Sequence, residues 1–438
     1  MKRKRHAIFF LFLFLLLTFV LVWYGFSQLP ITQRASVSGM RSSPSVLHTA
    51  PQNVFLLTPS LNFIIVNSTP SVTSFQQEGT SETLSGDQTR VSPTKLTPTR
   101  WLTATNTRLR RPTLSPTRSA TPTNPPPALS AAAAVQRMRR GVNMGNTLEA
   151  PNEGEWGYRI ERRHFQVIRA AGFDAVRIPT RWSAHAQLEA PYTIDPAFFA
   201  RLDEVIGWAL EENLVVVLNI HHYEEMATNP VAHRERFLAL WRQIAERYRN
   251  YPPTLLFELM NEPNGALTAP LWNEFVRQGV AVIRESNPTR NIIIGGVSWN
   301  SYDQLQFLEL PNDRHLIATF HYYLPFPFTH QGAEWIDGSD AWLGTPWSGT
   351  EEEQNEISHH FDMVENWSRT HNVPIYLGEF GAYHRADMES RVRWTRYVRE
   401  QAEARGFAWS YWEFGAGFGI YDRDSGQWRE DLLRALLP

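Results

Sequence analysis

Two acidic residues stand at positions where a buried strand would end. Glu262 follows the apolar run that begins at Leu255, and Pro263 stops that run. Glu379 closes a second short apolar run, which begins at Pro374. Because a carboxylate without partners is costly to bury, neither position has an obvious structural explanation. Two carboxyl groups that face each other across a sugar are the minimum equipment for hydrolysing a glycosidic bond.

The elements that must bring these two residues together are short apolar runs typical of parallel strands buried on both faces. We expect eight strands, over Gly141–Asn146, Ala175–Pro179, Val215–His222, Leu255–Asn261, Ile292–Gly296, Ile317–Tyr323, Pro374–Phe380 and Phe407–Phe414. Helical patterns separate them. The clearest begins at Asp195, an N-cap residue followed by Pro196, and a second covers His233–Arg249. The sequence therefore predicts an α/β fold, a (β/α)8 TIM barrel, over residues 131–438.

A TIM barrel makes a demand on this pattern, because its chemistry lies at the carboxyl ends of its strands. The predicted strand ends do carry polar and aromatic side chains. They are Asn143, Asn146, Arg177, His221, His222, Asn261, Glu262, Trp299, His321, Tyr323, Glu379 and Trp412. We therefore expect the two carboxylates to lie at one site on that face of the barrel.

The motifs at these strand ends resemble glycoside hydrolase family 5, the cellulase family, and they occur in the family's order over about residues 135–436. They are Gly141–Ala150, Val176-Arg177-Ile178-Pro179, Asn219–Tyr223, Asn261-Glu262-Pro263, His321-Tyr322-Tyr323, Gly378-Glu379-Phe380-Gly381 and Tyr411-Trp412-Glu413. Within the family the sequence resembles bacterial endo-β-1,4-glucanases, including some that act on both glucans and mannans. The resemblance thus implies an O-glycosyl hydrolase that cleaves inside a β-linked polysaccharide.

The resemblance also implies catalytic roles. Glu262 would be the general acid/base and Glu379 the nucleophile, with retention of configuration and a carboxyl separation of about 5–5.5 Å. An arginine beside the nucleophile would favour its ionised form. The remaining catalytic residues of the pattern are Arg177, His221, Asn261, His321 and Tyr323. His321 and Tyr323 are two apart on one strand and would therefore share a face around the nucleophile.

A second group of residues would bind the sugar chain. Trp412 matches the family's stacking platform, and Asn146 and Glu149 follow the first strand. The long stretch Leu324–Gly349 is typical of a functional loop and is interpreted as a sugar-binding wall, with simple loop packing as the alternative. The predicted substrate-binding residues are Asn146, Glu149, His222, His330, Trp335 and Trp412.

Some acidic and histidine residues have other interpretations. Glu258 lies deeper in its strand and is interpreted as structural, whereas Glu413 fits either role. His221 and His222 would point to opposite faces of a strand and so would not share a metal ion. We expect no metal and no cofactor, because the two carboxyl groups supply the proton and the nucleophile.

Three alternatives to an endoglucanase stay open. One changes only the polymer, to mannan, glucomannan, xyloglucan or mixed-linkage glucan. Another is a non-catalytic carbohydrate-binding barrel, and the third is a metal-dependent hydrolase. The net charge of −2 indicates no nucleic-acid partner, and the absence of cysteine excludes disulfides and thiol catalysis. We expect a monomer.

The N-terminal residues differ from the barrel in character. A cationic start, Lys2–His6, precedes an apolar run from Ile8 to about Phe26, which predicts a signal anchor or a cleaved signal peptide over residues 1–26. Residues 27–130 are rich in Ser, Thr and Pro and predict a disordered linker. We therefore expect an extracellular or cell-surface enzyme, anchored in the membrane or secreted.

Overall fold

The computed structural model describes residues 128–438. The predicted membrane segment over 1–26 and all but the last residues of the predicted linker lie outside the described residues. Within 128–438, no helix is both long enough and apolar enough to cross a bilayer. The first described helix, α2 (Ala131–Met138), starts after Ser130, whose Oγ accepts from the amide of Ala133 at 3.2 Å.

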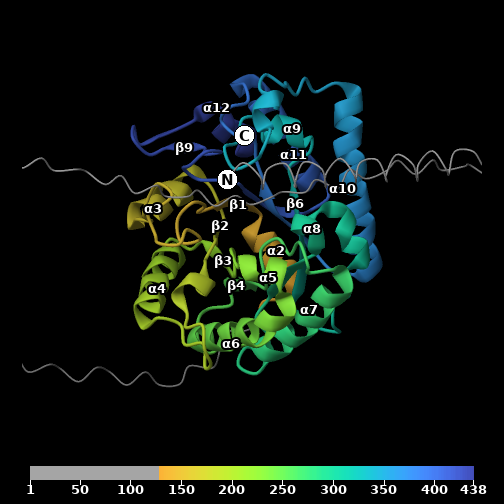
Figure 1. Ribbon diagram of the computed structural model, residues 1–438. Coiled ribbons are helices and arrows are strands. Elements are labelled where there is room, and N and C mark those ends of the chain that lie inside the picture. Colours follow the sequence, from red (N-terminus) through yellow and green to blue (C-terminus); the bar gives the residue numbers. More distant parts are fainter. Residues whose placement is uncertain (1–127) are drawn as a thin grey trace, which may run out of the picture. The chain divides into compact units, whose positions relative to one another are not determined.

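Eight strands form a closed barrel in sequence order, and each is parallel to its neighbours (Figure 1). They are β1 (Arg140–Asn143), β2 (Ala175–Ile178), β3 (Val215–Asn219), β4 (Leu255–Glu258), β5 (Ile292–Gly295), β6 (Leu316–Tyr322), β7 (Ile375–Phe380) and β8 (Ala408–Tyr411). The predicted eight-stranded parallel barrel is confirmed. Several strands end earlier than predicted, because the polar residues after them leave the ladder and turn into the loops above the barrel.

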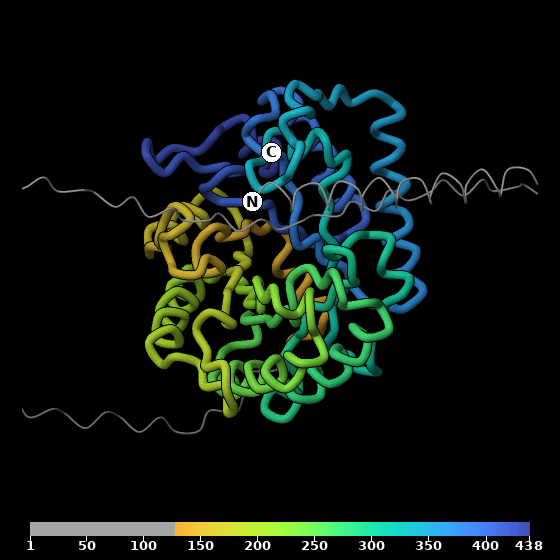
Figure 2. The backbone as a smooth tube through the Cα atoms, in the orientation of Figure 1, coloured from red at the N-terminus to blue at the C-terminus, as the bar shows by residue number. Residues whose placement is uncertain are grey.

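Helices surround the strands, as the tube in Figure 2 shows. The longer ones are α3 (Arg162–Ala171), α4 (Pro196–Glu211), α6 (Pro230–Tyr248), α7 (Ala269–Arg284), α10 (Glu351–His371), α11 (Met388–Ala404) and α12 (Glu430–Leu436). Short elements lie in the loops: α5 (Glu224–Thr228), α8 (Val297–Asn300), α9 (Phe326–Thr329), η1 (Trp182–His185), η2 (Tyr302–Phe307), η3 (Ser339–Trp342), β9 (Tyr421–Asp422) and β10 (Gln427–Trp428).

Alternation along the strands separates two hydrophobic cores. In β3, Val216 and Leu218 pack outward against the helices, while Val215 and Val217 point into the barrel. The inner core contains one such residue from most strands, and the apolar face of α2 joins it. The barrel interior is thus filled by side chains below the site. Two residues farther along, the inward positions turn polar, at Asn219 in β3 and likewise at Arg177, Glu258 and Thr319 in β2, β4 and β6.

The two helices expected from sequence are present. Helix α4 begins at Pro196, and the Asp195 side chain accepts from the amide of Ala197 at 2.8 Å, as predicted. Helix α6 starts at Pro230, three residues before the expected start, because Asn229 caps it and a proline suits the first helical position.

Removal of the α4 cap tests this account of the scaffold. Asp195→Ala leaves an amide of the first turn without its acceptor, so we expect the free energy of unfolding to fall by about 1 kcal/mol. Asp195→Asn keeps a side-chain oxygen and should lose much less. Denaturant unfolding of the two variants measures the difference, and equal losses would contradict a capping role.

Candidate active site

The guanidinium group of Arg177, at the inward position of β2, organises the site. It is fully buried, and it binds Glu258 through two hydrogen bonds, from Nε at 2.6 Å and from Nη2 at 2.9 Å. Nη1 donates to Glu379 at 2.7 Å, and Nη2 donates to Asn261 at 2.7 Å. A second bond from Nη1 reaches Asn143 at 2.9 Å. One side chain therefore fixes residues from strands β1, β4 and β7.

Glu258 has the structural role expected from sequence. It is fully buried, and both of its oxygens accept from Arg177. A buried arginine needs such a counter-ion, and the bidentate geometry also sets the direction of the remaining guanidinium protons. Glu258 thus aims Nη1 of Arg177 at Glu379.

Glu379 lies at the end of β7, with a side chain only 6% exposed. Besides the Arg177 contact, its Oε2 accepts from the Tyr323 hydroxyl at 2.9 Å. Burial raises the pKa of Glu379, and the charge of Arg177 and the Tyr323 hydrogen bond act against that increase. Two donors therefore favour the ionised form of a carboxyl group that has lost most of its water.

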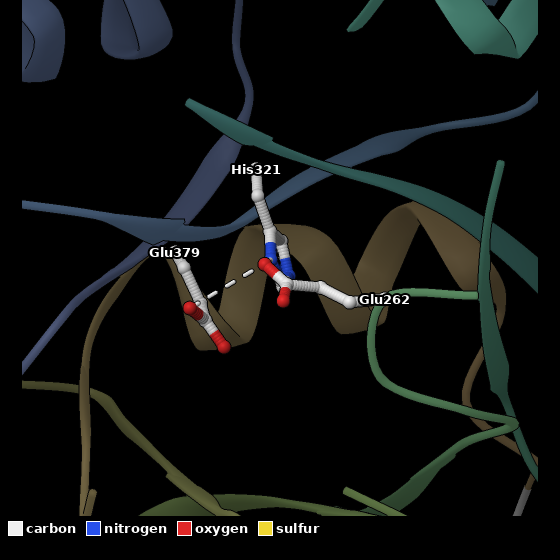
Figure 3. A group of neighbouring side chains, drawn as sticks. All are labelled: Glu262, His321 and Glu379. Carbon is white, nitrogen blue, oxygen red and sulfur yellow. Dashed lines mark hydrogen bonds and ion pairs between the residues drawn. The ribbon is translucent and has the colours of Figure 1, made fainter. Parts of the chain in front are cut away.

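Glu262 follows β4 and is partly open to solvent, with a side chain 24% exposed. Its Oε1 lies 2.8 Å from Nδ1 of His321, and Figure 3 shows the two side chains facing Glu379. Burial raises the pKa of Glu262 to about 8. This carboxyl group therefore holds its proton at neutral pH, unlike a carboxyl group in water.

His321 and Tyr323 were both expected to lie around Glu379, and this expectation is only half right. Tyr323 binds Glu379, but the short contact of His321 is to Glu262, and its Nδ1 lies 3.7 Å from Glu379. Burial lowers the pKa of His321 to about 4, so the ring is neutral. The register shift between Phe320 and His321 pairs His321 with Glu379 across β6 and β7 and places the ring between the two acids.

The separation of the acids has a direct chemical meaning. One carboxylate oxygen of Glu262, one of Glu379 and a ring nitrogen of His321 all lie within 4.8 Å of one another. Carboxyl groups about 5–5.5 Å apart leave room for direct attack on the sugar, whereas a separation of about 6.5–9.5 Å leaves room for a water molecule. The arrangement fits the expected short separation.

His221 and His222 do not point to opposite faces, contrary to expectation, because β3 ends before them at Asn219. Their rings lie edge to face with centroids 4.7 Å apart. His221 is buried and stacks on Trp412, with centroids 5.6 Å apart and planes 10° apart. Its Nδ1 lies 3.1 Å from Nδ2 of Asn219. His221 therefore holds the ring of Trp412, the expected stacking platform, while His222 remains partly exposed.

Trp156 was missed by the sequence analysis. It lies in the loop after β1, 40% exposed, and its ring edge contacts His222 at 5.6 Å. Glu153 anchors this loop, because it accepts two hydrogen bonds from Arg201, at 2.9 and 2.8 Å. In the sequence, the available signal was a tryptophan six residues after the Gly141–Ala150 motif.

Glu149 is not placed as expected for a sugar-binding residue. It is 1% exposed and accepts from the backbone amides of Asn146 and Thr147, so it holds the turn after β1. Burial raises its pKa to about 7.

Glu413, for which both roles were open, is fully buried, and burial raises its pKa to about 8. Asn146 stays half-buried, with a positive φ of 61°.

The stretch Leu324–Gly349 combines both interpretations proposed for it. Trp335 is 54% exposed, and its ring lies edge to face with Tyr383, with centroids 4.9 Å apart, so this part of the stretch presents an aromatic side chain to solvent. Trp347 is buried and belongs to the core. His330 is 8% exposed and stacks on Phe326 at 4.1 Å, and burial lowers its pKa to about 3. His330, which was predicted to bind substrate, is therefore packed inside the loop.

The raised pKa of Glu262 predicts how stability depends on pH. Between the unfolded value of 4.5 and the folded value of about 8, the folded protein holds a proton that the unfolded chain has released. This group's contribution is therefore complete below pH 4.5 and is lost as the pH rises through about 8. Glu262→Gln cannot ionise, so its melting temperature relative to wild type should rise from pH 4.5 to pH 8.5. A constant difference across that range would contradict the assignment.

Comparisons with known proteins agree with this geometry. Residues 139–417 match the family described as "Cellulase (glycosyl hydrolase family 5)". Endoglucanase H of Acetivibrio thermocellus is 41% identical over 322 residues, which are 72% of this chain and 34% of that protein. The cellulase/esterase CelE of the same organism is matched over 37% of its length. The chain thus spans about a third of the length of these two curated relatives.

Solved structures are similar over nearly their whole length. Endoglucanase Cel5A from the hyperthermophilic Thermotoga maritima is 50% identical, with a TM-score of 0.69, and the match covers 70% of this chain and 99% of that one. The same Thermotoga protein has been solved with mannotriose and with cellobiose. Because the family match covers more than half of the chain, this protein belongs to glycosyl hydrolase family 5, the cellulase family.

Proposed function

We propose that the barrel is a retaining endo-β-1,4-glucanase. The observation that carries the proposal is the pair of unlike carboxyl groups within 4.8 Å of each other. Glu379 is held by Arg177 and Tyr323, which favour its ionised form. Glu262 faces it with a pKa raised to about 8 by burial. One carboxyl group with two donors that favour its ionised form, facing another that keeps its proton, suits the two roles of a glycosidase.

In the first step, an oxygen of Glu379 attacks the anomeric carbon of the sugar. The bond from that carbon to the glycosidic oxygen breaks, and Glu262 gives its proton to the departing oxygen. The Asn261 oxygen accepts from Arg177, which leaves the amide nitrogen to donate to the 2-hydroxyl of the sugar. A hydrogen bond there strengthens as the oxocarbenium-like transition state forms.

In the second step, Glu262 is a carboxylate and acts as the base. It takes a proton from a water molecule, the water oxygen bonds to the anomeric carbon, and the bond to Glu379 breaks. The Tyr323 and Arg177 donors then stabilise the carboxylate that is released. Two inversions give net retention, and both carboxyl groups return to their starting protonation states.

Exposed aromatic rings around the acids support internal cleavage of a chain. Trp335 lies on the loop whose His330 contacts Tyr323, and Trp156 contacts His222. Trp299 is 41% exposed, and its backbone amide donates to the carbonyl of Pro263 at 3.3 Å. Exposed aromatic rings on three separate loops suit a substrate that continues beyond the bond that is cleaved.

The polymer preference is β-1,4-glucan, with mannan as a secondary substrate. The names of the relatives and the Thermotoga structure with mannotriose support this order. For location, we propose an extracellular or cell-surface enzyme tethered or exported through residues 1–26, with residues 27–130 as the spacer. The cationic start and the apolar run that follows support that part of the proposal.

A polymer panel tests the activity directly. The full chain should release reducing ends from soluble cellulose derivative and mixed-linkage glucan, faster than from glucomannan or mannan. Glu379→Gln removes the nucleophile but keeps its size, so we expect the rate to fall by at least about a thousandfold. Wild-type activity on mannan alone would replace glucanase by mannanase.

A folded protein without activity on any of these polymers would support the binding-barrel alternative. A chelator provides the remaining control, because Glu262, His321 and Glu379 could also hold a metal ion. The two-carboxylate mechanism predicts no loss of activity with a chelator, and a metal-dependent hydrolase predicts complete loss.

The acid role of Glu262 predicts an alkaline limit to activity. Because this residue must be protonated in the first step and its pKa is raised to about 8, kcat/KM on a glucan should fall tenfold per pH unit well above pH 8. A pH series of kcat/KM with a soluble substrate measures this limit. A midpoint below pH 6 would show that Glu262 loses its proton as readily as an exposed acid.

A further inference from the structure

Asn300, at the end of α8, contacts the catalytic histidine from the side opposite Glu262. It is fully buried, and its Nδ2 lies 3.4 Å from Nε2 of His321. Its Oδ1 has no hydrogen-bond partner among residues 128–438. The site described above involves Nδ1 of His321, which contacts Glu262, and leaves this second contact without a role.

The backbone that presents Asn300 is strained. Ser298, Trp299 and Asn300 have φ values of 52°, 59° and 56°, so three consecutive residues other than glycine are left-handed. Such a conformation is sterically unfavourable for any residue that carries a Cβ atom. A parallel bridge between Ser301 and His321 connects the turn to β6. Strain of this kind persists where surrounding structure enforces it, and it gathers at functional sites.

The end of β5 leaves space for this amide. A Cβ atom on Gly295 would lie 2.2 Å from Oδ1 and 2.5 Å from Cγ of Asn300, so a larger residue would displace the side chain. A Cβ atom on Gly378 would lie 2.8 Å from Nε2 of His321, the atom that Asn300 contacts. Two glycines therefore permit the close packing of the amide against the imidazole.

The contact decides where the histidine proton lies. An amide nitrogen can only donate, so Nε2 of His321 must accept. A neutral imidazole carries one proton, which is then on Nδ1, 2.8 Å from Oε1 of Glu262. Nδ1 therefore donates to Oε1, and the acid proton of Glu262 is left on Oε2. The opposite tautomer would present a bare Nδ1, which would draw that proton away from the substrate.

We propose that Asn300 is a positioning residue that fixes the tautomer of His321 and so directs the acid proton of Glu262 to the leaving group. This rests on the proposed function, since it presumes that Glu262 is the acid. Asn300 touches neither the substrate nor the reacting atoms in this scheme. Its effect is therefore confined to reactions in which the leaving group needs a proton.

The first test measures the tautomer in the wild-type full chain by nitrogen-15 NMR of its histidine rings. The His321 signals are assigned by their loss in His321→Asn. We expect a protonated Nδ1 and an unprotonated Nε2 between pH 6 and 8. A protonated Nε2 would overturn the proposal, and this measurement needs neither activity nor a variant of Asn300.

The second test compares leaving groups in Asn300→Gly, since glycine accepts a positive φ. We expect kcat/KM on a soluble glucan to fall about tenfold, as for other residues that orient a catalytic group. On 2,4-dinitrophenyl cellobioside, whose leaving group needs no proton, kcat/KM should change less than about twofold, because general-acid assistance is not involved. Equal losses on both substrates, or no loss on the glucan, would contradict the proposal.

Asn291→Gly is the matched control. Asn291 is 1% exposed, its Nδ2 donates to the carbonyl of Leu129 at 2.8 Å, and its Oδ1 also has no partner within 128–438. It lies at the start of β5, beside the chain leading into α2 below the barrel. This variant should lose stability and keep the wild-type ratio of the two rates. A wild type inactive on both substrates would defeat the proposed function, while the NMR result would still decide the tautomer.

Discussion

The buried guanidinium group of Arg177 is the interaction on which the site depends. It lies among Glu258, Glu379 and Asn261, with hydrogen bonds of 2.6–2.9 Å to the two acids. Removal of one partner from a buried ion pair is strongly destabilising, because the other charge stays buried. In the proposed mechanism, Glu258 therefore acts through Arg177 and not through the substrate. It compensates and orients the cation that favours the ionised form of Glu379, the proposed nucleophile.

Around that cation, the barrel gives two glutamates different chemistry. Glu379 meets two donors and little water, whereas Glu262 has a neutral histidine as its close partner. Both acids come from strand ends, where inward positions change from the apolar inner core to polar residues. The division of labour thus depends on strand alternation in the sequence and on a few side chains that cross between strands.

The strands and the two acids could be predicted from sequence because both leave periodic or local signals. Apolar runs ending in polar residues located Glu262 and Glu379, and the cap at Asp195 located a helix. The placements of Glu149 and of the His221–His222 pair could not be predicted in this way. Whether a carboxylate faces the cleft or its own turn depends on backbone amides that only the folded turn presents. The placement of His330 likewise depends on packing within its loop.

Trapping of the covalent intermediate tests the central claim most directly. The fluorine of a 2-deoxy-2-fluoro cellobioside slows both steps, and a good leaving group restores the rate of the first, so the glycosyl-enzyme should accumulate. Peptide mapping by mass spectrometry should then find one cellobiosyl adduct, on the peptide that contains Glu379. An adduct on another residue, or turnover without any adduct and with inversion of configuration, would contradict the account of Glu379 as the nucleophile held by Arg177.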